Sequence, residues 1–223
     1  MSALVIKTGM TVEQQIARKY AAEGILVLTG AFTPETLDQA VPQDCKAILS
    51  LGVCGGLADS ALIGQAFICS TLVTPDGEFE ADVDWRRRLF GATRYYECHW
   101  WSSGNFNTAN TVAERAALVK QTGCAVIDDE TFAVAAVAKK RGIAFQALRT
   151  VSDGAEDNLP PAVVNALNPD GSDNLYSVIA SVAQDPTQIP ALIQTAIEAK
   201  KSFDELETAC IQVGPNFQWQ SNS

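Results

Sequence analysis

The chain has 223 residues, of which 47% are apolar, and it carries 16 basic against 26 acidic side chains, a formal net charge of −10. A chain of this length can remove roughly 70% of its unfolded surface from water, so it can build a core without disulfide or metal cross-links. The negative charge repels phosphate backbones and anionic lipids, and the longest basic run is only Arg86-Arg87-Arg88. We therefore expect one globular domain spanning residues 1–223 and no nucleic-acid partner.

The sequence predicts neither a leader peptide nor a membrane span. The apolar run at the start of the chain is brief and soon meets Glu13. No stretch of about twenty uncharged apolar residues follows it. We therefore expect a cytoplasmic protein without stable membrane insertion.

Cysteine usage argues against metal or redox chemistry. The six cysteines are scattered without a C-x-x-C pair, and the chain has one histidine, His99. Most of the cysteines lie in apolar runs, where free cysteine behaves as a small buried hydrophobe. No metal and no cofactor is predicted.

Short β-branched runs alternate with helical patterns over the first 150 residues, which is typical of an α/β protein. The predicted strands lie at 3–9, 24–30, 46–53, 64–73, 124–128 and 143–153. The predicted helices lie at 11–24, 34–41, 83–92, 114–123 and 130–142.

The texture changes after Asp153. Two prolines at 160–161 are followed by turn residues at 168–174 and by one long apolar-periodic segment at 190–211. These features predict a helical C-terminal segment over about 158–212 that packs on the sheet. The last stretch, 214–223, is expected to be frayed.

A glycine cluster at 50–57 follows the strand predicted at 46–53. Glycine lets the backbone approach a ligand closely and present N–H groups to an anion or a sugar. The cluster lacks the G-x-G-x-x-G spacing and the GK[ST] ending of dinucleotide and P-loop sites. A tight structural turn is the alternative.

Three acidic features also lie where a predicted strand ends. Asp153 closes the strand at 143–153, and the carboxyl ends of strands are where α/β sheets bind ligands, although an Asp-Gly turn is the alternative. Asp128-Asp129-Glu130 precedes a helix, where acids can simply favour the N-terminus through its dipole. Glu13 lies in the first turn of a helix, whose start Thr11 and Gln14 could explain as a capping box.

In their order along the chain these features resemble the nucleoside phosphorylase and nucleosidase superfamily. The motifs that carry the resemblance are Gly52-Val53-Cys54-Gly55-Gly56-Leu57, Val126-Ile127-Asp128-Asp129-Glu130 and Arg149-Thr150-Val151-Ser152-Asp153. The resemblance implies a three-layer α/β/α fold with a central mixed, partly barrel-like sheet. A narrower likeness, to the hopanoid-associated phosphorylase group, rests on TGMTVEQQIAR, FEADVDWRRRLF and the tail from ALNPDGSDN to KKSFDEL.

In related methylthioadenosine/S-adenosylhomocysteine nucleosidases, one glutamate activates water, a second holds the ribose hydroxyls, and a late aspartate protonates the purine at N7. The motifs place these roles on Glu13, Glu130 and Asp153. The resemblance further implies that Ser152 orients Asp153 and that Phe106 stacks on the purine. The remaining implied substrate contacts are Val53, Cys54, Gly55 and Asp129.

The implied reaction is hydrolysis of a 5′-substituted adenosine, adenosylhopane-like or methylthioadenosine-like, to adenine. Val53 stands where phosphorylases usually carry a hydroxyl, and TGAFTPETL lacks their early arginine. A phosphate dianion would therefore lack hydrogen-bond partners. A phosphate-dependent phosphorylase remains one alternative. A catalytically silent nucleoside-binding relative is the other, because Asp129 stands where the resemblance implies a methionine. The resemblance also implies a homodimer, with the small-molecule nucleoside as the other partner.

Overall fold

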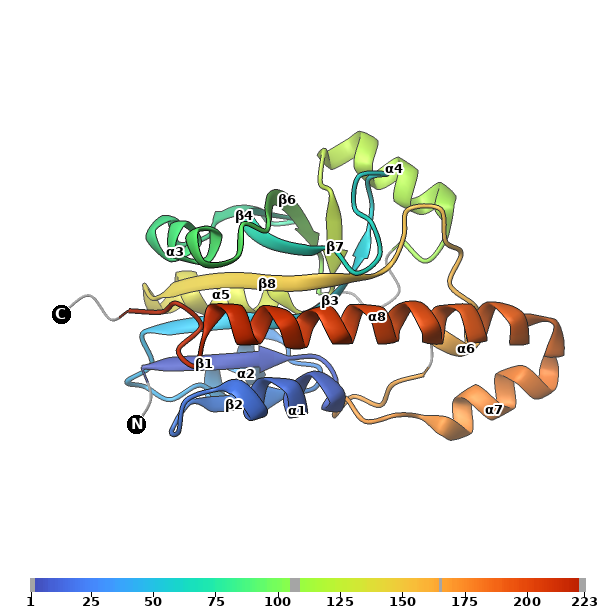
Figure 1. The fold of residues 1–223 in the computed structure, drawn as a ribbon, viewed down its shortest axis with the longest axis horizontal. Coiled ribbons are helices and arrows are strands. Elements are labelled where there is room, and N and C mark those ends of the chain that lie inside the picture. The colour runs from blue at the N-terminus through green and yellow to red at the C-terminus, as the bar shows by residue number, and fades with distance from the viewer. Residues whose placement is uncertain (1–2, 105–108, 165, 221–223) are drawn as a thin grey trace.

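The computed structural model describes residues 3–104, 109–164 and 166–220 of the chain, and it arranges them as one eight-stranded sheet with helices on both sides (Figure 1). The strands are β1 (Leu4–Thr8), β2 (Leu26–Thr29), β3 (Ala47–Gly56), β4 (Ala66–Thr74), β5 (Gly77–Glu80), β6 (Tyr96–Ser102), β7 (Val126–Asp128) and β8 (Ala144–Asp153). The helices are α1 (Thr11–Tyr20), α2 (Pro34–Ala40), α3 (Val83–Thr93), α4 (Val112–Thr122), α5 (Thr131–Arg141), α6 (Pro161–Val164), α7 (Leu175–Gln184), the short 3₁₀ helix η1 (Pro186–Gln188) and α8 (Ile189–Val213).

Five of the strands close into a ring. β3 pairs in parallel with β8, β8 pairs antiparallel with β4, and β4 pairs in parallel with β6. β6 then pairs in parallel with β7, and β7 returns antiparallel to β3. β1 and β2 extend the sheet from β3, and β5 extends it from β4. This closure confirms the predicted α/β class with a mixed, partly barrel-like sheet.

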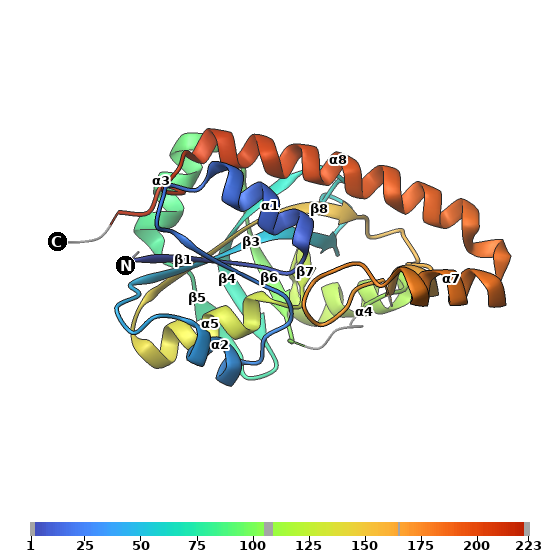
Figure 2. The same ribbon diagram turned by 90° about the horizontal axis from the view of Figure 1, so that it is seen from below.

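The helices form two outer layers with separate apolar cores. On one face α1, α3 and α8 bury residues such as Ala17, Trp85 and Leu206 against the sheet, whereas α2 and α5 bury Leu37 and Val134 on the opposite face (Figure 2). α8 is buried only toward its C-terminal end, and its first half leaves isoleucines exposed. No helix in the described part of the chain is long and apolar enough to span a membrane.

Several predicted elements differ from the structure. The glycine cluster is not a loop after a strand, because β3 continues to Gly56 with β8 on one side and β7 on the other. α1 ends at Tyr20 rather than at residue 24, since Ala21 is already extended. The strands β5 and β6 were not predicted from the sequence, because neither shows the apolar alternation of a half-buried strand.

The C-terminal stretch is packed, so the expectation of a frayed end at 214–223 is wrong for its described part. Phe217 is fully buried, and its carbonyl accepts a hydrogen bond of 2.7 Å from the Trp85 indole Nε1. The Trp219 ring lies 5.0 Å from the Trp85 ring. The polar composition of this stretch predicted a frayed end, whereas its two aromatic side chains, Phe217 and Trp219, pack beside Trp85.

Candidate functional site

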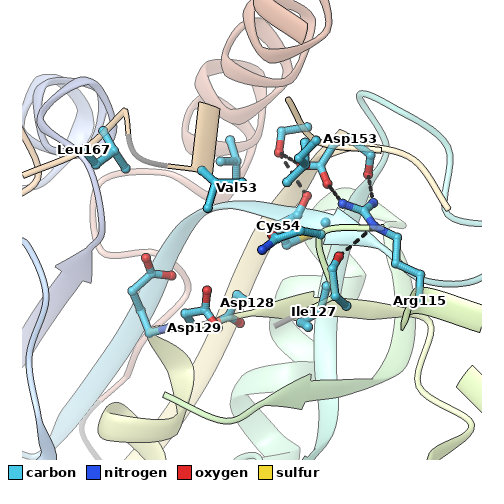
Figure 3. Close-up of a pocket in the computed structure, with 15 residues that line it drawn as sticks. Val53, Cys54, Arg115, Ile127, Asp128, Asp129, Asp153 and Leu167 are labelled. Atoms are coloured by element: carbon cyan, nitrogen blue, oxygen red, sulfur yellow. Dashed lines mark hydrogen bonds and ion pairs between the residues drawn. The ribbon is translucent and has the colours of Figure 1, made fainter. Parts of the chain in front are cut away.

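A cavity of about 240 Å³ opens at the carboxyl ends of β3, β7 and β8 (Figure 3). This is the edge at which α/β sheets gather ligand-binding residues. Seven of the predicted site residues line it: Val53, Cys54, Gly55, Asp129, Glu130, Ser152 and Asp153. Glu13 lies behind the cavity wall, and Phe106 lies outside the described residues.

Glu13 is enclosed by backbone donors. Its Oε2 accepts hydrogen bonds from the N–H groups of Gly9 at 2.7 Å and Met10 at 2.8 Å, and its Oε1 accepts one from Val53 at 2.7 Å. Only 1% of the residue is exposed, and this burial raises the pKa of its carboxyl. The carboxyl is thus fixed beside Val53, which lines the cavity.

The start of α1 differs from the predicted capping box. Met10, and not Thr11, is the N-cap residue, and Glu13 at the third helical position binds the Met10 N–H. The Thr11 hydroxyl instead donates to the carbonyl of Gly171, 160 residues further along the chain. Glu13 therefore caps its own helix as well as holding the Val53 N–H behind the cavity wall.

Two glycines make room for the glutamates. A side chain at Gly52 would collide with the Glu13 carboxyl. The position that a Cβ would take on Gly9 lies within 3.4 Å of both a Glu130 and a Glu13 carboxyl oxygen. Glu13 and Glu130 thus converge on one point although 117 residues separate them in the sequence.

Glu130 is held ionised by a buried arginine. Arg149 Nη1 lies 3.0 Å from Glu130 Oε2, and it also donates to the Val53 carbonyl at 2.7 Å. Burial by itself would raise the pKa of Glu130, but the charges of Arg149 and Lys7 outweigh it and the pKa is lowered. Glu130 is therefore an acceptor ready for a ligand's hydroxyl groups.

Asp128 and Asp129 have different roles although they are adjacent. Asp128 Oδ1 accepts the N–H groups of Glu130 at 2.8 Å and Thr131 at 2.6 Å, so it starts α5 as the helix-dipole alternative expected. Burial, reinforced by Glu130 and Asp128, raises the pKa of Asp129 to about 8. Its buried Oδ1 has no hydrogen-bond partner among the described residues.

Lys7 is a buried charged residue close to these acids, and it was not predicted from the sequence to belong to the site. It lies in β1 and is fully buried, and burial lowers the pKa of its ammonium to about 8, against the opposing effect of Glu130. The signal was present in the sequence, because a lysine follows the apolar run Ala3-Leu4-Val5-Ile6 within the strand predicted at 3–9. We call Lys7, Glu13, Asp128, Asp129, Glu130 and Arg149 the carboxylate cluster.

Asp153 lies at the other end of the cavity, where Figure 3 shows it facing Arg115. The Ser152 hydroxyl donates to Asp153 Oδ1 at 2.7 Å. Arg115 Nη2 forms an ion pair with Asp153 Oδ2. Such a pair stabilises the negatively charged carboxylate.

Arg115 was also missed. It is 1% exposed on α4, and its Nε donates to the Ala109 carbonyl at 3.0 Å while Nη1 donates to the Gly56 carbonyl at 3.1 Å. In the sequence it stands three residues before Leu118, on the helix face that is buried. An arginine on an apolar helix face was the available signal.

The cavity is therefore acidic at one end and holds one ion pair at the other. Among the described residues, Arg115 is the only cationic side chain that lines the cavity, and it is already paired with Asp153. An incoming polyol would meet acceptors, whereas a phosphate dianion would meet carboxylates. Within the described ranges, no group of three or more His, Cys, Asp or Glu side chains is arranged to hold a metal ion.

Comparisons with known proteins agree with the fold. A family model described as "Phosphorylase superfamily" matches residues 17–184. No curated protein matches the chain.

Several solved structures share the architecture at low sequence identity. A futalosine hydrolase of Helicobacter pylori aligns with a TM-score of 0.61 at 14% identity, covering 93% of this chain and 96% of that one. The 5′-methylthioadenosine/S-adenosylhomocysteine nucleosidase of Helicobacter pylori, solved with butyl-thio-DADMe-Immucillin-A, aligns with a TM-score of 0.61 at 14% identity, covering 92% and 96%. The nucleosidase of that name from Neisseria meningitidis, solved with methylthio-immucillin-A, gives 0.63 at 13% identity, covering 94% and 98%.

Proposed function

Because the chain belongs to the phosphorylase superfamily, we propose that it is a purine nucleosidase, which hydrolyses the N-glycosidic bond of a 5′-substituted adenosine and releases adenine. The observation that carries this proposal is the convergence of Glu13 and Glu130 on one point beside a cavity whose other end holds Asp153. A nucleoside has its ribose at one end and its base at the other, and this cavity has Glu130 at one end and Asp153 at the other. Several structurally similar proteins are nucleosidases.

The ribose belongs at the carboxylate cluster. Cleavage of the glycosidic bond builds positive oxocarbenium character on the sugar, and preorganised negative charge stabilises it. Glu130, kept ionised by Arg149, accepts hydrogen bonds from the ribose hydroxyls. Glu13 takes a proton from the attacking water, and the raised pKa of its carboxyl increases its strength as a base.

The purine belongs at the other end, where Asp153 delivers a proton to N7 so that adenine leaves as a neutral molecule. Asp153 is paired with Arg115 in the structure, so it has to take up a proton from solvent and this pair has to loosen when the base binds. Ser152, bonded to Asp153 Oδ1, keeps the carboxyl oriented meanwhile. Val53, Cys54 and Gly55 supply the wall between the two ends.

Water is the nucleophile in this proposal. The carboxylate cluster would repel a phosphate dianion, and Val53 offers no hydroxyl to bind one. The 5′ substituent of the proposed substrate is apolar, and the most specific form of the proposal is a hydrocarbon such as that of adenosylhopane. The apolar side chains of Leu159, Val164 and Leu167 on the cavity wall support an apolar substituent. A cytoplasmic homodimer completes the proposal, and the homodimer follows from the resemblance alone.

The second candidate is a nucleoside-binding protein without turnover. The observations that favour it are the enclosure of Glu13, which is only 1% exposed, and the attachment of Asp153 to Arg115. Asp129 adds a polar group where relatives carry methionine. Both candidates bind a nucleoside, and they differ in whether adenine is released.

The test is to incubate the protein with adenosine, 5′-methylthioadenosine and a 5′-alkyl-5′-deoxyadenosine, with and without phosphate, and to measure free adenine by chromatography. Hydrolysis predicts adenine release that does not depend on phosphate, fastest with the alkyl substituent. Strict dependence on phosphate would favour a phosphorylase. A ligand-induced rise in the unfolding temperature without adenine would favour the binding protein.

A further inference from the structure

Lys7 occupies an unusual place for a lysine. It lies in β1 between two parallel neighbours, with Leu28 of β2 and Ser50 of β3 as its register partners. The residue is 0% exposed, and its Nζ has no hydrogen-bond partner among the described residues. A buried ammonium without hydrogen bonds is unfavourable for folding, so nothing in the core accounts for a lysine here.

The surroundings of Lys7 are acidic. The neighbours whose charges act on it come from four elements around the strand. They are Glu130 at the start of α5, Glu13 in α1, Asp128 and Asp129 at the end of β7, and Arg149 in β8. Lys7 and Arg149 are therefore the two cations of a cluster that contains four carboxyl groups.

Arg149 cannot balance this cluster alone. Its Nη1 is shared between Glu130 and the Val53 carbonyl, and its Nη2 donates to the Ser50 hydroxyl at 2.9 Å. Its Nε is 3.7 Å from Asp128 Oδ2. Among the described residues, Glu13 receives hydrogen bonds only from backbone N–H groups. The positive charge that remains uncommitted near the two glutamates is that of Lys7.

We propose that Lys7 is a positioning residue of this site, and that its buried ammonium favours the ionised forms of Glu130 and Glu13 around one ribose. The ribose in this statement rests on the proposed function, whereas the effect on the two carboxyl groups does not. Lys7 does not line the cavity, so it acts through the glutamates rather than on the substrate.

This role has opposite consequences for activity and stability as the pH rises. Burial lowers the pKa of Lys7 from its ordinary 10.5 to about 8, so Lys7 is charged at pH 7 and loses its proton above pH 8. Activity should then fall, because the two glutamates lose their counter-charge. Between pH 8 and 10.5 the unfolded chain holds a proton on Lys7 that the folded protein has released, so this residue makes stability rise with pH.

The variant Lys7→Met keeps the length of the side chain and removes its charge. Lys46→Met is the matched control, since it removes the charge of an exposed lysine just before β3. The primary measurement is a ¹³C NMR titration of the glutamate carboxyl carbons in the free protein, with Glu13→Gln and Glu130→Gln used for assignment. Because the two acids titrate as a pair, the shared midpoints are compared.

We expect the higher midpoint to rise by about one pH unit or more in Lys7→Met, a tenfold change in proton affinity, and to stay in place in Lys46→Met. Unchanged midpoints in Lys7→Met would overturn the proposal. Adenine release should fall mainly through kcat, and the rise of stability between pH 8 and 10.5 should disappear. If both Lys7→Met and Lys7→Gln failed to fold, Lys7 would be structural and the proposal would be overturned.

Failure of this inference can be told apart from failure of the proposed function. The carboxyl titration needs neither substrate nor turnover, so it decides the effect of Lys7 even if no nucleoside is cleaved. Conversely, adenine release by the wild-type protein together with unchanged midpoints in Lys7→Met would retain the nucleosidase and dismiss the role of Lys7.

Discussion

At one end of the cavity Glu13 and Glu130 are held by three backbone N–H groups and a buried arginine, whereas at the other end Asp153 is held by its neighbour Ser152 and by Arg115 from α4. The first end is attached to strands and helix starts that the sheet fixes in place. The second depends on a side chain reaching across from a helix outside the ring of strands.

This difference suits the two tasks of glycosidic cleavage. Charge that stabilises an oxocarbenium ion is most effective when it is fixed before the reaction starts. A proton donor has to change its protonation state during each turnover, so Asp153 has to exchange its contact with Arg115, itself anchored to backbone carbonyls, for a contact with the base. The end with fixed negative charge therefore fits the ribose, and the end with Asp153 fits the leaving base.

The largest expected effect tests the proton donor. Asp153→Asn keeps the shape of the side chain but cannot deliver a proton, so adenine release should fall about 10²-fold or more. Asp59→Asn, which changes an exposed acid, is the control and should leave the rate unchanged. A wild-type rate in Asp153→Asn would remove the base-end assignment.

A smaller effect on rate, combined with one on folding, is expected at the ribose end. In Glu13→Gln an amide NH₂ must face a backbone N–H whichever way it is oriented, because both carboxyl oxygens accept backbone hydrogen bonds. The change should cost about 1–3 kcal/mol of unfolding free energy and lower the rate of adenine release. Urea denaturation measures the first and chromatography the second. Full stability with lost activity would mean that the backbone donors do not fix Glu13.

The smallest effect concerns Asp129 and the pH dependence of stability. The pKa of Asp129 is raised from 3.8 to about 8 in the folded protein. Between these two pH values the folded protein keeps a proton on Asp129 that the unfolded chain has released. Stability from this group is therefore present below about pH 4 and is lost as the pH rises through 8. Asp129→Asn should match the wild type near pH 4 and exceed it at pH 8 by a few degrees in Tm.

Thermal unfolding between pH 4 and 8.5 checks this expectation, with the exposed Asp76→Asn as control. A difference in Tm that stays constant with pH would show that Asp129 is not protonated in the folded state. The ribose end of the cavity would then no longer include a carboxyl group with a raised pKa at Asp129.

Much of the fold could be predicted because its signals are local. Helix α5 ends at Arg141, just before Gly142 in the left-handed conformation and within one residue of the predicted end, and β8 carries its apolar run to Asp153. The carboxyl ends of these strands also located the cavity, since parallel strands deliver their ends to one edge. Glu130 and Asp153 could be placed there by the same reasoning.

The remaining features depend on contacts between distant segments. The glycine cluster becomes a strand only because β7 and β8 pair with it on both sides. Phe217 is buried where its carbonyl binds the Trp85 indole, which lies far from it in the sequence. Arg115 reaches Asp153 across 38 residues of chain. None of these pairings has a local pattern in the sequence.

By itself the sequence determined most of the helices and strands and which acids stand at their ends, because periodicity and strand ends are properties of neighbouring residues. Only the tertiary structure decided which charges meet. The pairing of β1 and β8 with β3 places Lys7 and Arg149 near Glu13 and Glu130, and α4 sets Arg115 against Asp153. Electrostatic interactions act through space, so the protonation states on which the proposed reaction depends belong to the folded chain.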